Sequence, residues 1–262
     1  MDKLYEEIEK NNGDRIFTFG EIVHNPDVNE KLRKNNVFIC EDIDKIPSGS
    51  KVFIRTHGLP KEIVTKLKAS GLKIFDMTCP RVVRIHEIVS LYDSVIITGD
   101  KNHPEVDGIK GHCLNKCYIV KNVEELNNII SKIRTPTVMV SQTTFNTNTW
   151  NEMVEIAEKN PFITVKNTIC DATSIRQKQV EELARQSDFF VVIGGKNSSN
   201  TNKLYEIASQ YCETIKIEKK EDLPELFGYK KIGLSSGAST PAETIEEVIN
   251  YMENENGKVL NE

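Results

Sequence analysis

Two cysteines hold equivalent places in a repeated pattern. Cys79 lies in Thr78-Cys79-Pro80 and Cys170 in Ile169-Cys170-Asp171, and each opens a stretch of similar plan. A site with one cysteine from each of three such stretches would hold three thiolates. An odd number of thiolates suits a metal or an iron–sulfur cluster better than disulfides, and three ligands to a four-iron cluster leave one iron open for a substrate. Taken singly, each cysteine is explained by packing at the end of a strand. The repeat favours ligation.

Polar loops form a second repeated feature, with two loops in each stretch. The loops of the first set precede helices: His24-Asn25-Pro26, His103-Pro104-Glu105 and Ser198-Ser199-Asn200. The second set is Thr56-His57-Gly58, Gln142-Thr143-Thr144 and Gly237-Ala238-Ser239-Thr240. Imidazoles, hydroxyls and backbone N–H groups at helix starts suit a phosphate or diphosphate. Helix capping by Ser, Thr and Asn explains some of these residues, but it does not require histidines in corresponding loops.

Glu105 follows His103 by two positions in one of these loops. A carboxylic acid beside an imidazole in a closed pocket is a good proton donor. The helix dipole also favours a glutamate in the first turn of a helix, so both explanations stay open. Of the other histidines, His86 is predicted on the surface in the middle of a helix, and His112 begins a Cys113–Cys117 segment that resembles half a zinc site without a second half.

Short apolar segments alternate with helical patterns and predict an α/β fold with parallel sheets. The predicted strands are 15–19, 37–40, 51–56, 73–76, 94–98, 117–120, 137–141, 189–193, 214–217 and 231–235. The predicted helices are 3–9, 28–34, 60–69, 84–91, 123–132, 149–159, 175–186, 202–210 and 242–252. Ligands bind at the carboxyl ends of strands in such sheets. The repeat predicts three pseudo-threefold-related modules, 1–78, 79–169 and 170–262, with their loops converging near one axis.

The composition indicates a protein of the cytoplasm. The chain has 262 residues, a net charge of −5, no apolar run of membrane-spanning length and a charged N-terminal segment unlike a signal peptide. The irregular spacing of six cysteines fits a reducing compartment, and Cys40 and Cys212 are predicted to be core residues. No basic stripe marks a nucleic-acid interface. We therefore expect no membrane or nucleic-acid partner.

The first module has no cysteine at its head. The spacing from cysteine to first loop is 24 residues in one module (79 to 103) and 28 in another (170 to 198). The same spacing before His24 falls at positions 0 to −4. This module also opens on a predicted helix without a strand before it. We therefore expect an opening strand and its cysteine to be missing, which would leave the first sheet a strand short, at a cost of about several kcal/mol in buried apolar surface.

At these loops the chain resembles the 4-hydroxy-3-methylbut-2-enyl diphosphate reductase (IspH, or LytB) family of the non-mevalonate isoprenoid pathway. The segments that carry the resemblance run in order from about residue 15 to residue 252. They are Glu21-Ile22-Val23-His24-Asn25, Thr56-His57-Gly58, Asp76-Met77-Thr78-Cys79-Pro80, His103-Pro104-Glu105-Val106-Asp107-Gly108, Gln142-Thr143-Thr144, Lys196-Asn197-Ser198-Ser199-Asn200-Thr201-Asn202 and Gly237-Ala238-Ser239.

The resemblance implies a trefoil of three α/β domains around a central 4Fe–4S cluster. It implies that Cys79 and Cys170 ligate the cluster, that Glu105 delivers protons and that Thr143 positions the substrate's hydroxyl with His103 nearby. The residues implied to hold the allylic diphosphate substrate are His24, His57, His103, Thr143, Ser198, Ser199, Asn200 and Ser239. Two electrons and protons then remove the hydroxyl as water, giving isopentenyl or dimethylallyl diphosphate. A small ferredoxin or flavodoxin is implied as the electron donor.

The chain departs from the family pattern at one position. The family opens with a strand that ends in Gly-Phe-Cys, and that cysteine, the third ligand, is not in this sequence. Two other interpretations therefore stay open. One is a non-enzymatic remnant that binds diphosphates without a complete cluster. The other is a nucleotide-binding α/β protein with capping loops and structural thiols.

Overall fold

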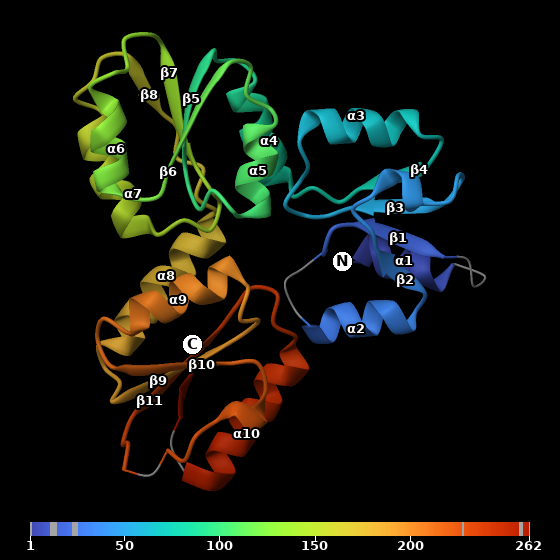
Figure 1. Ribbon diagram of the computed structural model, residues 1–262. Helices are drawn as coiled ribbons and strands as arrows, with labels where there is room; N and C mark the ends of the chain where they lie inside the picture. The colour runs from blue at the N-terminus through green and yellow to red at the C-terminus, as the bar shows by residue number, and fades with distance from the viewer. Residues whose placement is uncertain (1, 11–14, 23–25, 227, 257–258, 262) are drawn as a thin grey trace. The chain divides into compact units, whose positions relative to one another are not determined.

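Three parallel sheets organise the computed structural model, which describes residues 2–10, 15–22, 26–226, 228–256 and 259–261 (Figure 1). Within these residues each sheet has four strands. The first sheet comprises β1 (Ile16–Phe19), β2 (Val37–Ile39), β3 (Lys51–Ile54) and β4 (Lys73–Asp76). The second comprises β5 (Ser94–Thr98), β6 (Lys116–Val120), β7 (Thr137–Ser141) and β8 (Ile163–Val165). The third comprises β9 (Phe189–Ile193), β10 (Glu213–Ile217), β11 (Ile232–Ser236) and β12 (Val259–Asn261).

The three sheets share one strand order. It is β2-β1-β3-β4 in the first, β6-β5-β7-β8 in the second and β10-β9-β11-β12 in the third. The central strands β5, β7 and β9 are buried along their whole length, as expected of apolar runs in parallel sheets. The prediction of three α/β modules with parallel sheets is confirmed. The prediction that the first sheet is a strand short was wrong, because in the described residues this sheet has four strands in the same order as the other two sheets.

Helices lie on both faces of the sheets, as Figure 1 shows for α4 and α5 on one side of the second sheet and α6 and α7 on the other. Their bounds are α1 (Asp2–Glu9), α2 (Pro26–Lys34), α3 (Lys61–Ala69), α4 (Pro80–Val89), α5 (Pro104–Lys110), α6 (Val123–Ile130), α7 (Thr147–Ala157), α8 (Asp171–Ala184), α9 (Ser199–Ala208) and α10 (Ala242–Asn256). Two 3₁₀ turns, η1 (Ile43–Lys45) and η2 (Lys220–Asp222), complete the described elements. Within the described part of the chain, no helix is both long and apolar enough to cross a membrane.

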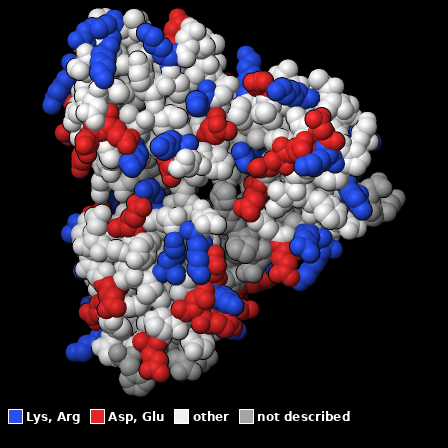
Figure 2. Space-filling view, in the orientation of Figure 1, with Lys and Arg blue, Asp and Glu red and all other residues white. Residues whose placement is uncertain are grey.

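Two compact units divide the chain. The first carries the first two sheets and ends at Thr168, and the second is built mainly from Ile169 onward together with the short segment Thr144–Thr147. Helix α4 packs Ile85 and Val89 into the core of the second sheet, and α8 likewise packs on the third. This packing supports our proposal of module boundaries at 78/79 and 169/170. On the face drawn in Figure 2, acidic and basic side chains are interspersed, in keeping with the small net charge of −5.

Several elements differ from their predicted bounds. Strands β8 and β12, of three residues each, were not predicted. Helix α5 was missed because it has only seven residues, one of them Gly108, a weak helix former. Helices α4 and α8 begin four residues earlier than predicted, at Pro80 and Asp171, since a cysteine takes the N-cap position of each.

Gly233 gives a test of packing in the third sheet. A Cβ added there would lie 2.4 Å from Phe190 Cδ2, and Phe190 is fully buried. We expect Gly233→Ala to lower the free energy of unfolding by about 1–3 kcal/mol through overpacking. Urea unfolding measures this change. The double variant with Phe190→Leu should lose less than the sum of the two single losses, because the smaller side chain makes room for the methyl group. An unchanged midpoint for Gly233→Ala would contradict this packing.

Candidate functional site

Four predicted site residues come together in the first unit. Strands β5 and β7 are neighbours, with Thr98 paired to Ser141 at their carboxyl ends. The loop after β5 leads to His103 and Glu105, and the loop after β7 carries Thr143. Parallel topology therefore brings two loops that lie far apart in sequence to one sheet edge, where ligands bind in α/β folds.

Contacts with Glu105 and His57 orient the ring of His103. It is the N-cap of α5, and its Nδ1 accepts a hydrogen bond from the backbone N–H of Glu105 at 3.1 Å. In the neutral ring the proton therefore resides on Nε2. The ring of His57, from the loop after β3, lies edge-on to it with centroids 5.3 Å apart and an interplanar angle of 84°. The cap thus turns one N–H of His103 away from the helix.

Glu105 is buried, with 2% of its surface exposed. Its Oε1 accepts from the backbone N–H of Thr143 at 2.6 Å and its Oε2 from the Thr143 hydroxyl at 2.7 Å. Burial raises the pKa of Glu105, and the two bonds from Thr143 act in the opposite direction without cancelling the rise. The carboxyl group therefore keeps its proton to higher pH than an exposed glutamate, as a general acid at neutral pH requires.

Cys79 adjoins this cluster through the backbone. Its N–H donates to the carbonyl of Thr56 at 2.9 Å, next to His57. It is the N-cap of α4, and its half-buried side chain makes no capping hydrogen bond. Cys170, in the second unit, holds the same position at the start of α8, also as a free thiol without a capping bond.

These two cysteines suit the iron–sulfur cluster implied by the sequence. Iron–sulfur clusters are held by cysteine thiolates, and a helix N-terminus stabilises a negative charge. Each cysteine offers one sulfur without a competing capping bond. Among the residues that the structure describes, no three His, Cys, Asp or Glu side chains form a ready metal site.

A second group of predicted residues lies at the carboxyl ends of β9 and β11 in the second unit. Ser198 caps α9, and its hydroxyl accepts from the backbone N–H of Thr201 at 3.4 Å. Asn200 follows in the first turn and is 7% exposed. Its Nδ2 is buried and has no hydrogen-bond partner within the described residues. A buried donor without an acceptor costs about 1–3 kcal/mol, so an anion at this helix N-terminus would satisfy it.

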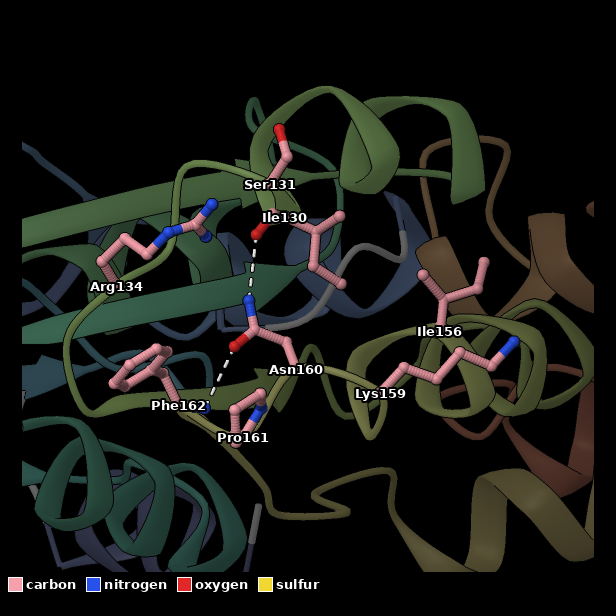
Figure 3. A pocket seen from close by; sticks show the side chains of 8 residues that line it. All are labelled: Ile130, Ser131, Arg134, Ile156, Lys159, Asn160, Pro161 and Phe162. Atoms are coloured by element: carbon pink, nitrogen blue, oxygen red, sulfur yellow. Dashed lines mark hydrogen bonds between the residues drawn. The ribbon is translucent and has the colours of Figure 1, made fainter.

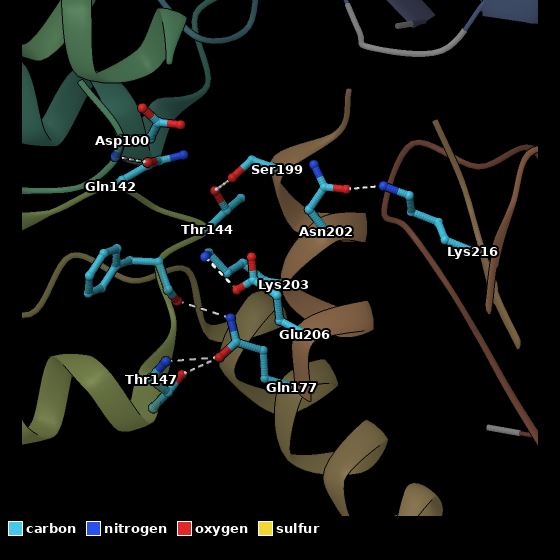
Figure 4. A network of polar contacts seen from close by, with 11 residues as sticks. Asp100, Gln142, Thr144, Thr147, Gln177, Ser199, Asn202, Lys203, Glu206 and Lys216 are labelled. Carbon is cyan, nitrogen blue, oxygen red and sulfur yellow. Dashed lines mark hydrogen bonds and ion pairs between the residues drawn. The ribbon is translucent and has the colours of Figure 1, made fainter. Parts of the chain in front are cut away.

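The loop that carries Ser239 lies beside this helix start. The N–H of Gly237 donates to the carbonyl of Ile193 at 2.8 Å, and the hydroxyl of Thr240 donates to the same carbonyl at 3.1 Å. Ser239 lies between these anchors and is half-buried. The Ser199 hydroxyl is 2.9 Å from the Thr144 hydroxyl, as Figure 4 shows. The second unit thus gathers Ser198, Ser199, Asn200 and Ser239 at the ends of two adjacent strands, whereas His24 lies outside the described residues.

His86 corrects one prediction. It is 8% exposed and therefore buried rather than at the surface, and its ring stacks on that of His112 with centroids 3.9 Å apart. The signal was present in the sequence, because His86 falls in the stripe formed by Val82, Ile85 and Val89 at helical spacing. Cys113 and Cys117, which follow His112 in the sequence, are partly buried and pack against the core of the second sheet.

Two cavities in the first unit lie away from the predicted residues. One, of about 510 Å³, is shown in Figure 3, where the Asn160 side chain donates to the carbonyl of Ile130 at 3.0 Å and accepts from the N–H of Phe162 at 3.0 Å. The other, of about 620 Å³, lies between α2 and the edge strand β2. Neither is lined by a residue predicted to bind substrate or cluster.

Comparison with known sequences gives consistent matches. The model of a family described as LytB protein matches residues 1–253. A 4-hydroxy-3-methylbut-2-enyl diphosphate reductase from Caldanaerobacter subterraneus is 39% identical, with 98% of this chain and 92% of that protein covered. One from Clostridium perfringens is 43% identical, with 92% of this chain and 88% of that protein covered. A longer relative of the same name from Clostridium acetobutylicum is 44% identical, and the alignment covers 91% of this chain but only 38% of that protein.

Solved structures give the same result. The structure of the E-1-hydroxy-2-methyl-but-2-enyl-4-diphosphate reductase from Plasmodium falciparum aligns with a TM-score of 0.90 at 28% identity, covering 99% of this chain and 85% of that chain. A second structure, of (E)-4-hydroxy-3-methyl-but-2-enyl diphosphate reductase, the terminal enzyme of the non-mevalonate pathway, aligns with a TM-score of 0.68 at 38% identity. It covers 97% of this chain and 93% of that chain.

Proposed function

The chain belongs to the LytB protein family, and on that premise we propose that it is a 4-hydroxy-3-methylbut-2-enyl diphosphate reductase. In the proposed reaction the bond between carbon and the allylic hydroxyl breaks, and two electrons and two protons are taken up. One proton leaves in water, and the other forms the new carbon–hydrogen bond of isopentenyl or dimethylallyl diphosphate.

The observation that carries this proposal is the environment of Glu105. A buried glutamate with a raised pKa lies beside His103 and is held by both the backbone and the hydroxyl of Thr143. A protonated Glu105 supplies a proton toward the reacting end of the substrate, and Thr143 orients the carboxyl group. We also assign the Thr143 hydroxyl to hydrogen-bond the departing hydroxyl. Such positioned proton transfer contributes about 10²–10⁴-fold to a rate.

The diphosphate is assigned to residues whose chemistry suits an anion. These are His24, His57, His103, Ser198, Ser199, Asn200 and Ser239. The start of α9 supports the assignment, because backbone N–H groups and the Asn200 amide meet there at the positive end of a helix of ten residues. The ring of His57 lies edge-on to the ring of His103, so the two imidazoles are assigned to the same part of the substrate.

Cys79 and Cys170 are assigned as ligands of a 4Fe–4S cluster. Their sulfurs make no capping hydrogen bonds, and both residues stand at the starts of helices. The cluster, when bound, supplies the electrons and Lewis acidity that the protein's own side chains lack. A small ferredoxin or flavodoxin as electron donor and a cytoplasmic location are parts of the same proposal and rest on the family resemblance.

Oxidation of a reduced dye tests the proposed activity. The anaerobically purified protein should oxidise reduced methyl viologen when 4-hydroxy-3-methylbut-2-enyl diphosphate is added. Dimethylallyl diphosphate is the matched control, because it has the diphosphate but no hydroxyl to remove. Equal rates with the two compounds, or no oxidation with either, would contradict the proposal. Binding of both compounds without any oxidation would identify a diphosphate-binding protein instead.

Asn200→Ala tests the diphosphate assignment. The substitution removes a buried amide whose Nδ2 has no described partner, so we expect no loss of folding stability. A hydrogen bond to a charged group contributes about 1.5–3 kcal/mol, so the affinity for substrate or inorganic pyrophosphate should fall about ten- to hundredfold. Calorimetric titration measures this affinity. Asn127→Ala, at an exposed position in α6, is the control. Unchanged pyrophosphate affinity for Asn200→Ala would remove Asn200 from the site.

A further inference from the structure

The stacked rings of His86 and His112 form a buried element that the proposed reaction does not use. The rings are nearly parallel, with centroids 3.9 Å apart and an interplanar angle of 12°. His86 comes from α4, and His112 follows the last turn of α5. The pair thus joins two helices of the second module.

Both histidines also contact the loop that carries His57. The Nε2–H of His112 donates to the carbonyl of Leu59 at 3.1 Å. Gly58 adopts a left-handed backbone with φ of +73°, and a Cβ there would lie 2.7 Å from His86 Cε1. His86 therefore lies directly under Gly58, and His112 holds the next residue along. Only glycine fits at position 58, for steric and conformational reasons together.

Further close approaches hold the same loop to α5. The N–H of Lys61 donates to the carbonyl of Gly111 at 3.4 Å. A Cβ at Gly111 would lie 2.4 Å from Pro60 Cβ, and one at Gly108 would lie 3.3 Å from the carbonyl oxygen of His57. Small residues on α5 thus let the His57 loop approach the helix that begins at His103 and Glu105. The stacked rings of His86 and His112 contact the same loop at Gly58 and Leu59.

The charge state of the pair is compatible with stacking. Burial, followed by repulsion from His112, lowers the pKa of His86 to about 4, although Asp76 acts in the opposite direction. Burial also lowers the pKa of His112, with a further lowering from Lys61 and an opposing effect of the bond to Leu59. Both rings are therefore neutral at pH 7. Two positive rings at this distance would repel each other.

We propose that the His86–His112 stack is a positioning element that clamps residues 57–59 onto α5 and thereby fixes the His57 imidazole beside His103. The pair does not touch substrate. It acts through His57, and the proposal rests on the assignment of His57 to the diphosphate. Packing alone would be served by two apolar rings, whereas the bond from His112 to Leu59 requires a donor. The N–H of His112 therefore holds the loop in the one position where the carbonyl of Leu59 can accept its hydrogen bond.

A double-mutant cycle tests this proposal with inorganic pyrophosphate as the probe. His112→Phe keeps a ring in the stack but removes the donor to Leu59, so we expect about a tenfold loss of pyrophosphate affinity. His112→Gln restores a donor and should stay within about twofold of the unmodified protein. In a His57→Ala background His112→Phe should cause no further loss, because its effect passes through His57. If His112→Phe does not fold, Gly58→Ala replaces it, since the added Cβ displaces the loop from His86.

Three results would overturn the proposal: full pyrophosphate affinity in His112→Phe, a loss in His112→Gln as large as in His112→Phe, or additive losses in the double variant. Additive losses would mean that the stack contributes only general stability. Calorimetry with pyrophosphate needs no turnover, so these results stay separate from the dye assay of the unmodified protein. A protein that shows no reductase activity but the expected cycle would refute the reductase function and keep the clamp.

Discussion

Glu105→Gln is expected to lower the turnover number about 10²–10⁴-fold, with a much smaller change in KM. Glutamine is close in shape to a protonated glutamate, so the contact with the Thr143 N–H remains. It has no proton to give to the substrate carbon or to the departing hydroxyl. The loss therefore falls on the chemical step rather than on binding. Steady-state assays with reduced methyl viologen separate the two parameters, and Glu87→Gln, at an exposed position in α4, is the matched control.

The raised pKa of Glu105 predicts how the turnover of the wild type and of Glu105→Gln depends on pH. The acid form is the active form, so wild-type turnover should fall as pH rises through that pKa, and this limb should be absent from the residual activity of Glu105→Gln. For folding the sign is also defined. Because the pKa of Glu105 is higher in the native state than in the unfolded chain, where it is near 4.5, its contribution to the free energy of unfolding is lost as pH rises above 4.5.

The glutamine variant should therefore be at least as stable as wild type at neutral pH. Thermal unfolding at several pH values checks this expectation. If Glu105→Gln turned over as fast as the wild type, or if its turnover fell at high pH as that of the wild type does, Glu105 would not be the proton donor. A variant that loses activity together with its fold would show a structural role instead.

Cys79→Ser and Cys170→Ser are each expected to remove most of the bound iron and sulfide and to abolish turnover. A serine hydroxyl is not ionised at neutral pH and does not replace a thiolate as a cluster ligand. Both positions are helix N-caps, where serine is a preferred residue, so the helices α4 and α8 should keep or gain stability. The loss should therefore appear in a folded protein.

Iron and acid-labile sulfide assays on anaerobically purified protein measure this loss independently of activity. Cys212→Ser is the control, because Cys212 packs against the core formed by α8, α9 and β9 and is not an N-cap. Full iron content in either Cys79→Ser or Cys170→Ser would refute the ligand assignment. Equal iron loss in Cys212→Ser would point to general instability of the protein rather than to ligation.

The repeat made most of the fold predictable from sequence. Strands β4, β5, β7 and β9 have the predicted bounds, because each has apolar residues at its centre. The starts of α4 and α8 could not be predicted in the same way, since Cys79 and Cys170 are unusual N-caps. At these two positions the N-cap side chain makes no capping hydrogen bond, and the same positions are assigned to the cluster.

The candidate site was predictable as single loops but not as contacts. The sequence placed His103, Glu105 and Thr143 at the ends of strands, and parallel sheets bring such ends to one edge. The bonds between Glu105 and Thr143 depend on β5 and β7 being neighbours, which follows from the strand order and not from residue types. His86 was misplaced because a polar residue in an apolar helical stripe was taken as exposed.

Product identification in deuterated water tests the proposed function most directly. Anaerobic protein, reduced methyl viologen and 4-hydroxy-3-methylbut-2-enyl diphosphate are incubated together, and the diphosphates are separated and analysed by mass spectrometry. We expect isopentenyl and dimethylallyl diphosphate that have lost the hydroxyl oxygen and carry one solvent-derived deuterium on carbon. Recovery of unchanged substrate from protein that holds its iron–sulfur cluster and binds pyrophosphate would contradict the assignment of this chain as a reductase.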